Sequence, residues 1–343
     1  MSSHSVQKKK IPYQVSPNLS DYLSTNGRLQ NIPVQYEDLL RFTTSISLYD
    51  KYGKDTLWLT VAYSQSEIEE LNRELTKIYA ILKTNGDIKV MEHLHIERID
   101  FCTFGNSKPF RIKVVNNYND NYDYYYIKLA DSSRIYGLEW EHILSPNRIN
   151  YFVNNQTLVE EHIVGIPGDQ FIKNNFSDPE VNEIRLAKEF VKFNERCLVR
   201  LLGDMRSYNY VVDVTPDFED TQYRIRAIDF DQQSFEGRKS LYIPQYFKEN
   251  TPFVELCMKH LNVNTVKQYQ SEERSLIARR VRTSKYNTDH LLDVMKQDNL
   301  STLEKTETLK TELAEHYNHP IFNRCSNMGE IMEESLNVLL LKS

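Results

Sequence analysis

The sequence has little glycine, with 10 glycines in 343 residues and no Gly-x-Gly-x-x-Gly motif, so it lacks the usual glycine-rich phosphate loop. Its four cysteines lie far apart and form no Cys-x-x-Cys pair, which excludes a typical zinc site or disulfide framework and favours a reducing cytoplasm. No window approaches the roughly 18 apolar residues of a membrane span. The basic run at the N-terminus precedes no apolar segment, so no Sec-type signal peptide is expected.

The bulk composition indicates a globular protein with an acidic balance. Hydrophobic residues make up 40% of the chain, enough for the core of one large or two to three small domains. The formal net charge is -6, so nucleic acid is not an expected partner.

The order of hydrophobic patterns predicts an α+β fold in three parts. Residues 1–87 read as an N-terminal module that starts with a loose tail over 1–15. Residues 88–165 read as antiparallel strands with one inserted helix, and 166–343 as a helical region with a C-terminal helical extension. A long amphipathic helix after Asp178 is expected to use that aspartate as its N-cap.

One hairpin carries the residues with the clearest chemical pattern. Two β-like runs, "YNYVVDV" and "QYRIRAIDF", flank a polar turn. Asp204 and Asn209 precede the first run in an Asp-x-x-x-x-Asn pattern, and Asp229 ends the second. Pairing of the two strands would bring Asn209 and Asp229 together at one end of the hairpin.

Upstream patterns extend this set. Lys128 ends a tyrosine-rich strand, and the next helix carries Glu139 and Glu141. Glu139 shares the apolar helix face and is expected to point inward. The full order is strand lysine, helix glutamate, hairpin, loop, long helix, Asp-x4-Asn, hairpin and strand aspartate.

In this order the chain resembles the protein-kinase-like superfamily, and most closely the aminoglycoside and choline phosphotransferases. The segments that carry the resemblance are "YYIK", "LVEEHIVGIPGDQF", "LGDMRSYN" and "AIDFD", and it covers roughly residues 95–260. It implies a two-lobed kinase-like fold, with a small antiparallel β lobe, a larger helical lobe and an N-terminal extension.

The resemblance also implies a reaction and its partners. The chain would be an ATP-dependent phosphotransferase that uses Mg²⁺ or Mn²⁺ and passes the γ-phosphoryl group to a hydroxyl of a small molecule or protein. The roles that it implies are catalysis by Asp204 and Arg206, nucleotide binding by Lys128, Glu139, Gly105, Glu161 and Ile163, and metal binding by Asn209, Asp229 and Asp231.

The sequence departs from the family pattern at four places. One is the interval from Lys128 to Glu139, which is shorter than in the family. Leu202 stands where the family has a histidine, Asp231 where many relatives have a glycine, and Gly105 is the one glycine placed to shape a phosphate-covering turn. These departures keep open a pseudokinase that binds nucleotide without turnover, and an AMP transferase. Each residue also has a plain structural interpretation: Asp204 and Asn209 as turn residues, Asp229 as a strand end, and Lys128 as an edge-strand charge.

Overall fold

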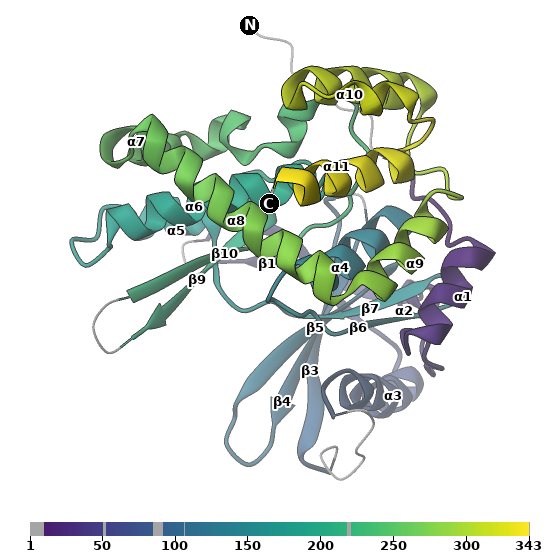
Figure 1. Ribbon diagram of the computed structural model, residues 1–343. Coiled ribbons are helices and arrows are strands. Elements are labelled where there is room, and N and C mark those ends of the chain that lie inside the picture. Colours follow the sequence, from purple (N-terminus) through teal and green to yellow (C-terminus); the bar gives the residue numbers. More distant parts are fainter. Residues whose placement is uncertain (1–9, 51–52, 85–91, 106, 218–220, 343) are drawn as a thin grey trace, which may run out of the picture. The chain divides into compact units, whose positions relative to one another are not determined.

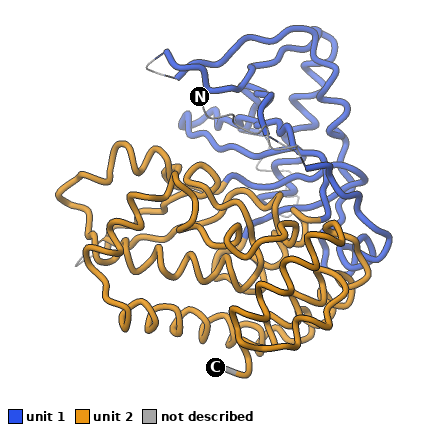
Figure 2. The backbone as a smooth tube through the Cα atoms, turned by 90° about the horizontal axis from the view of Figure 1, so that it is seen from above, with its two compact units in different colours: residues 1–132, 149–162 blue, residues 133–148, 163–343 orange. Residues whose placement is uncertain are grey.

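The protein is α+β, as predicted, and divides into two compact units (Figures 1 and 2). Unit 1 comprises residues 1–132 and 149–162, and unit 2 comprises residues 133–148 and 163–343. The computed structural model describes residues 10–50, 53–84, 92–105, 107–217 and 221–342. The predicted boundary between residues 87 and 88 lies outside these described ranges.

Unit 1 is built on an antiparallel sheet, which has seven strands in the described part of the chain, in the order β1-β2-β3-β4-β5-β7-β6. The strands and the inserted helix expected within 88–165 are present. Asn155 and Gln156, rather than the predicted Asn-Asn pair, turn the hairpin β6–β7, and Asn155 has a left-handed conformation (φ 52°). Pairing of β2 with β3 joins the predicted N-terminal module and the predicted β lobe in one sheet. The strand bounds are Thr44–Tyr49 (β1), Asp55–Ala62 (β2), Leu94–Cys102 (β3), Phe110–Asn116 (β4), Tyr122–Leu129 (β5), Tyr151–Asn154 (β6) and Thr157–Glu161 (β7).

Three helices accompany this sheet: α1 (Pro17–Thr25), α2 (Tyr36–Leu39) and α3 (Gln65–Thr84). The apolar residues of α3 recur at helical spacing, and Leu75 and Ile78 on that face are fully buried. They pack in one hydrophobic cluster with sheet residues, and the Tyr125 hydroxyl donates a hydrogen bond to the Leu75 backbone oxygen over 2.8 Å. The sheet therefore has a continuous apolar core on the side of α3.

Unit 2 is mainly helical and contains a small sheet in the order β10-β9-β8. Helix α6 lies in its core, where Phe190 and Phe193 pack against Phe253 of α7 and Tyr210 of β9. Its elements are α4 (Ser132–Leu144), β8 (Ile166–Pro167), α5 (Gly168–Asn174), α6 (Glu183–Val199), β9 (Tyr210–Pro216), β10 (Thr221–Ala227), α7 (Thr251–His260), α8 (Val263–Thr283), α9 (Lys285–Met295), α10 (Leu303–Tyr317) and α11 (Met328–Lys342). Short 3-10 turns lie at Ser207–Asn209, Lys239–Tyr242, Pro244–Tyr246, Lys248–Asn250 and Pro320–Arg324.

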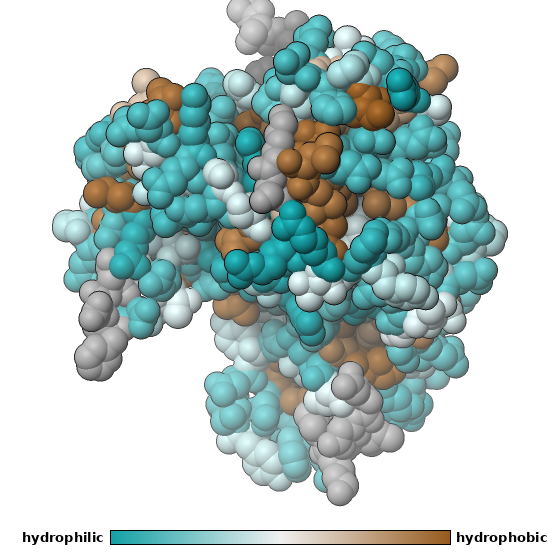
Figure 3. All heavy atoms as spheres, in the orientation of Figure 1, coloured by the Kyte–Doolittle hydropathy of each residue, from teal (hydrophilic) through white to brown (hydrophobic). Residues whose placement is uncertain are grey.

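The side chains on the face in Figure 3 are mostly hydrophilic, with smaller apolar areas between them. This agrees with helices that bury one apolar stripe and expose the rest. Within the residues that the structure describes, no helix is long and apolar enough to cross a membrane.

Two local predictions were wrong. Residues 10–15 are not a loose tail: Lys10 Nζ forms a buried ion pair with Asp131 over 2.9 Å, and the Tyr13 oxygen accepts a hydrogen bond from the Ser132 N–H. The N-cap of α6 is Asn182, whose side chain accepts from the Arg185 N–H, four residues beyond Asp178. In both cases a tertiary or capping bond outweighs the weak local pattern on which the prediction depended.

Candidate functional site

The hairpin β9–β10 brings its two outer ends together, as the sequence predicts. Tyr210 pairs with Ala227 at the open end of the ladder. The Ile228 N–H then donates to the Asn209 backbone oxygen over 3.0 Å. Asn209 and Asp229 therefore lie just beyond the last paired positions, on neighbouring strand ends.

Tyr210 anchors this end of the hairpin in the core of unit 2. Its ring is fully buried, 5.2 Å from the ring of Phe193 between centroids, and its hydroxyl donates to Asn250 Oδ1 over 2.8 Å. Asn250 in turn donates to the backbone oxygen of Met205 over 2.9 Å. The loop that contains Asp204 and the strand that follows it are thus held by the same buried side chains.

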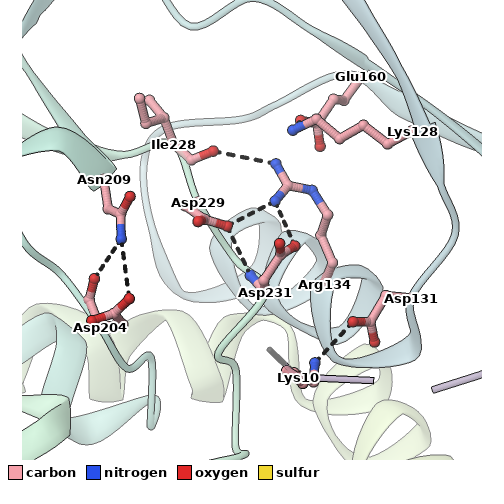
Figure 4. A network of polar contacts seen from close by, with 10 residues as sticks. All are labelled: Lys10, Lys128, Asp131, Arg134, Glu160, Asp204, Asn209, Ile228, Asp229 and Asp231. Carbon is pink, nitrogen blue, oxygen red and sulfur yellow. Dashed lines mark hydrogen bonds and ion pairs between the residues drawn. The ribbon is translucent and has the colours of Figure 1, made fainter. Parts of the chain in front are cut away.

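Asp204 is fixed at the start of this loop by its backbone and its neighbours. It has φ 57°, a left-handed conformation that aspartate tolerates better than most residues. Asn209 Nδ2 donates to the Asp204 backbone oxygen over 2.7 Å, and Figure 4 shows the amide directed at Asp204. The carboxylate lies beside Asn209 and is one-third exposed, open to an incoming group.

The electrostatics of Asp204 suit a proton acceptor. Burial raises the pKa of its carboxyl above the usual range, and the bond that Arg206 Nε donates over 2.8 Å opposes this shift. A raised pKa makes a carboxylate a stronger base toward a hydroxyl. Arg206 also pairs with Glu249 over 2.9 Å, so two carboxylates hold its guanidinium.

Asp229 and Asp231 both bind one arginine that the sequence patterns did not single out. Arg134, in the first turn of α4, donates from Nη1 to Asp229 Oδ1 over 2.9 Å and to Asp231 Oδ1 over 2.8 Å. Its other terminal nitrogen donates to the Ile228 oxygen over 3.2 Å (Figure 4). The Asp231 N–H donates to Asp229 Oδ1 over 3.1 Å, which fixes the turn between the carboxylates.

A close approach of α4 to the same segment makes these bonds possible. Gly137 lies one turn after Arg134, and a Cβ atom there would be 2.8 Å from the Cβ of Phe230. Phe230 is buried between the two aspartates in sequence. Glycine at this position therefore lets the helix contact the Asp229–Asp231 segment directly.

The loop before Asp204 is also joined to the segment after Asp231. Leu202, which directly precedes Gly203 and Asp204, is fully buried and forms a bridge with Gln233. The Gly203 N–H donates to the Gln232 oxygen over 3.3 Å, and Ser234 N–H donates to the Leu201 oxygen over 2.8 Å. Backbone bonds thus connect these two segments without a histidine side chain.

The two glutamates of α4 are both buried. Glu141 forms an ion pair with Arg200, the residue that caps the C-terminus of α6. Glu139 belongs to unit 2 and Lys128 to unit 1, so their pairing stays a prediction.

Within unit 1, Lys128 pairs with Glu160, a residue that the sequence patterns did not mark. The register of β5 and β7 places Lys128 opposite Leu158, so Glu160 lies two residues further along on the same face. Both side chains are almost completely buried, at 8% and 6% exposure. Lys128 is therefore not an exposed charge on an edge strand, because β5 lies between β4 and β7 in the sheet.

The three other residues predicted to bind nucleotide, Glu161, Ile163 and Gly105, each contact different parts of the chain. Glu161 pairs with Lys83 of α3 over 3.2 Å and accepts from the Asn150 N–H over 2.7 Å. Ile163 is buried just beyond unit 1. Gly105 has φ 97° in the turn between β3 and β4. A Cβ atom at this position would have no contact within 4 Å outside the adjoining residues.

A divalent metal ion does not fit the aspartate pair as the side chains lie. One guanidinium already lies between Asp229 and Asp231, and Asp231 is 4% exposed. Among the described residues, no group of three or more histidine, cysteine, aspartate and glutamate side chains is placed to hold a metal. Asn209 and Asp229 lie on neighbouring strand ends, but the Arg134 guanidinium binds the Asp229 carboxylate where a metal ion would be expected.

Comparisons with known proteins add little to this geometry. No protein-family model and no curated protein sequence matches the chain. One solved structure that matches, "Titin kinase and its flanking domains", has 14% sequence identity to the chain and a TM-score of 0.29. The match covers 72% of this chain and 55% of that chain, and a score of this size carries no argument about shared fold or function.

Proposed function

We propose that this chain is a kinase-like phosphotransferase that binds ATP and transfers its γ-phosphoryl group to a hydroxyl of a small molecule or protein. The observation that carries the proposal is the convergence of Asp204, Asn209 and the Asp229 segment at the open end of one hairpin. The order of residues in the sequence predicts this arrangement independently of the contacts. Phosphoryl transfer requires mainly such positioning, together with charge neutralisation.

The order of elements supports the proposal. A strand that ends in Lys128 precedes α4, the hairpin β6–β7, the long helix α6, the Asp204 loop and the hairpin β9–β10, in the order that the resemblance requires. Lys128 lies on the third strand of the run β3, β4 and β5, as the phosphate-binding lysine does in protein kinases.

The proposed reaction transfers one phosphoryl group and one proton. The acceptor oxygen forms a bond to the γ-phosphorus, the bond from that phosphorus to the β,γ-bridging oxygen breaks, and ADP leaves. Asp204 takes or orients the proton of the acceptor hydroxyl. Lys128 would bind the α- and β-phosphates, and adenine would bind to the backbone from Val159 to Ile163.

A second candidate is a pseudokinase, a nucleotide-binding module without turnover. The contact of Arg134 with both Asp229 and Asp231 favours it, because these are the carboxylates on which metal-assisted transfer would depend. AMP transfer by the same fold is a third outcome that one experiment separates from the others.

The test uses the full chain with γ-labelled and α-labelled ATP, each in Mg²⁺, in Mn²⁺ and in EDTA. Label recovered in protein, acceptor or phosphate from γ-labelled ATP alone supports phosphoryl transfer. Recovery from α-labelled ATP alone indicates AMP transfer. A rise in Tm with ATP but no label transfer indicates the pseudokinase, and no rise at millimolar ATP contradicts all three.

A further inference from the structure

We propose that the Arg134 guanidinium occupies the cation position between the Asp229 and Asp231 carboxylates. It thereby prevents a divalent metal ion from binding both of them. The biological meaning of this inference rests on the proposed function. The hydrogen bonds of Arg134 to Asp229 and Asp231 do not depend on that function. The inference predicts that the usual metal requirement of kinase-like chemistry is weakened here by a residue of the chain itself.

The hydrogen bonds of Arg134 occupy the space between the two carboxylates. A single nitrogen of Arg134 donates to one oxygen of each aspartate, at 2.9 and 2.8 Å. An ion that bound both carboxylates would need the position between them, where that nitrogen lies (Figure 4). Arg134 and a bridging metal are therefore mutually exclusive.

Arg134 is also buried and carries a permanent positive charge. The Arg134 side chain is 2% exposed, so it faces these carboxylates and is not a mobile surface group. Its guanidinium cannot lose its charge in the pH range of proteins. A divalent cation at Asp229 would then lie close to a fixed positive charge in a partly dry environment, which disfavours binding.

Helix α4 holds Arg134 in this position. Gly137 allows the helix to approach the Phe230 side chain closely, and the Ile228 oxygen accepts a third bond from the guanidinium. Opening the pair to a metal would therefore require these three hydrogen bonds of the guanidinium to break.

The test is Mn²⁺ binding to the full chain without nucleotide, measured by electron paramagnetic resonance of free Mn²⁺. Arg134→Met is expected to bind Mn²⁺ at least about tenfold more tightly than wild type, because it removes the competing charge. Adding Asp229→Asn to that variant should abolish the gain. Arg224→Met is the matched control: it removes one arginine charge from the same unit, where Arg224 bonds to Asn147, and should bind Mn²⁺ as wild type does.

Arg134→Met leaves Asp231 buried without its arginine, so circular dichroism must show that the variant folds. If it does not, Arg134→Met with Asp231→Asn replaces it, since that variant removes both members of the buried pair, and tighter Mn²⁺ binding than in wild type is still expected. Binding no tighter than wild type in the folded variant overturns the inference. A gain in Mn²⁺ binding without any ATP binding would support the role of Arg134 and contradict the proposed function.

Discussion

The side-chain amide of Asn209 donates a hydrogen bond to the Asp204 backbone oxygen over 2.7 Å, across the five-residue separation of the Asp-x-x-x-x-Asn pattern. The same amide lies 3.5 Å from the Asp204 carboxylate. This contact closes the loop between α6 and β9, so Asp204 has one defined place beside the hairpin end. The Asp-x-x-x-x-Asn spacing thus lets the Asn209 side chain bond to the Asp204 backbone within one loop.

The pH dependence of transfer should report the raised pKa of Asp204. Because burial raises this pKa, the base form is lost as the pH falls through a value above about 3.9, the usual figure for aspartate. We expect the acid limb of the kcat profile above that value. An acid limb that persists unchanged in Asp204→Asn would assign it to another group.

The same shift predicts an effect on stability. A carboxyl with a folded-state pKa above its unfolded value opposes folding once the pH rises through the folded pKa. Asp204→Asn should therefore keep or raise Tm at pH 7 relative to wild type, with a smaller difference at pH 4. Calorimetry at both pH values provides the check, and a lower Tm of the variant at pH 7 alone would contradict this sign.

The buried pair of Lys128 and Glu160 should be essential for the stability of unit 1. Lys128→Met removes the lysine partner of the buried Glu160 carboxylate, and breaking a buried ion pair in this way costs about 3–5 kcal/mol of unfolding free energy. Adding Glu160→Gln should restore much of this loss, because both charges of the pair are then removed. Urea unfolding gives the free energy of unfolding of the wild type, of Lys128→Met and of the double variant.

An exposed pair serves as the control for that experiment. Lys285 and Asp289 form a bond of 2.8 Å on the surface of α9, and Lys285→Met should cost less than about 1 kcal/mol. Equal losses for Lys128→Met and Lys285→Met would mean that burial does not govern the Lys128 pair.

Gly137→Ala should destabilise the protein although alanine is the better helix former. The propensity gain is about 1 kcal/mol, but the new Cβ would be 2.8 Å from the Phe230 Cβ, and such overpacking costs about 1–3 kcal/mol. We expect a lower unfolding midpoint. Thr308→Ala, on the exposed side of α10, is the control without a steric clash and should be neutral or slightly stabilising.

The sequence predicted those elements whose signal is local. The hairpin β9–β10, the strands within 88–165 and the Asp204–Asn209 loop follow from periodicity, turn residues and short separations. The pairing of Lys128 with Glu160 was also within reach, because strand register alone places them on one face.

Contacts between distant segments were not predictable in this way. Arg134 is 95 residues from Asp229, and nothing in the pattern "SSRIYG" marks an arginine as a partner of two aspartates. Lys10 is similarly 121 residues from Asp131. Such pairs depend on how the helices and strands pack, which a single sequence does not encode in any short motif.

The most direct test of the account compares Asp204→Asn with wild type and with Asp213→Asn, in which a carboxylate of the same hairpin is lost away from its open end. ATP affinity comes from calorimetry, and transfer from γ-labelled ATP. The account predicts that all three proteins bind ATP alike, that Asp213→Asn transfers as wild type does, and that Asp204→Asn transfers on the order of a hundredfold more slowly. Transfer by Asp204→Asn at the wild-type rate would contradict it.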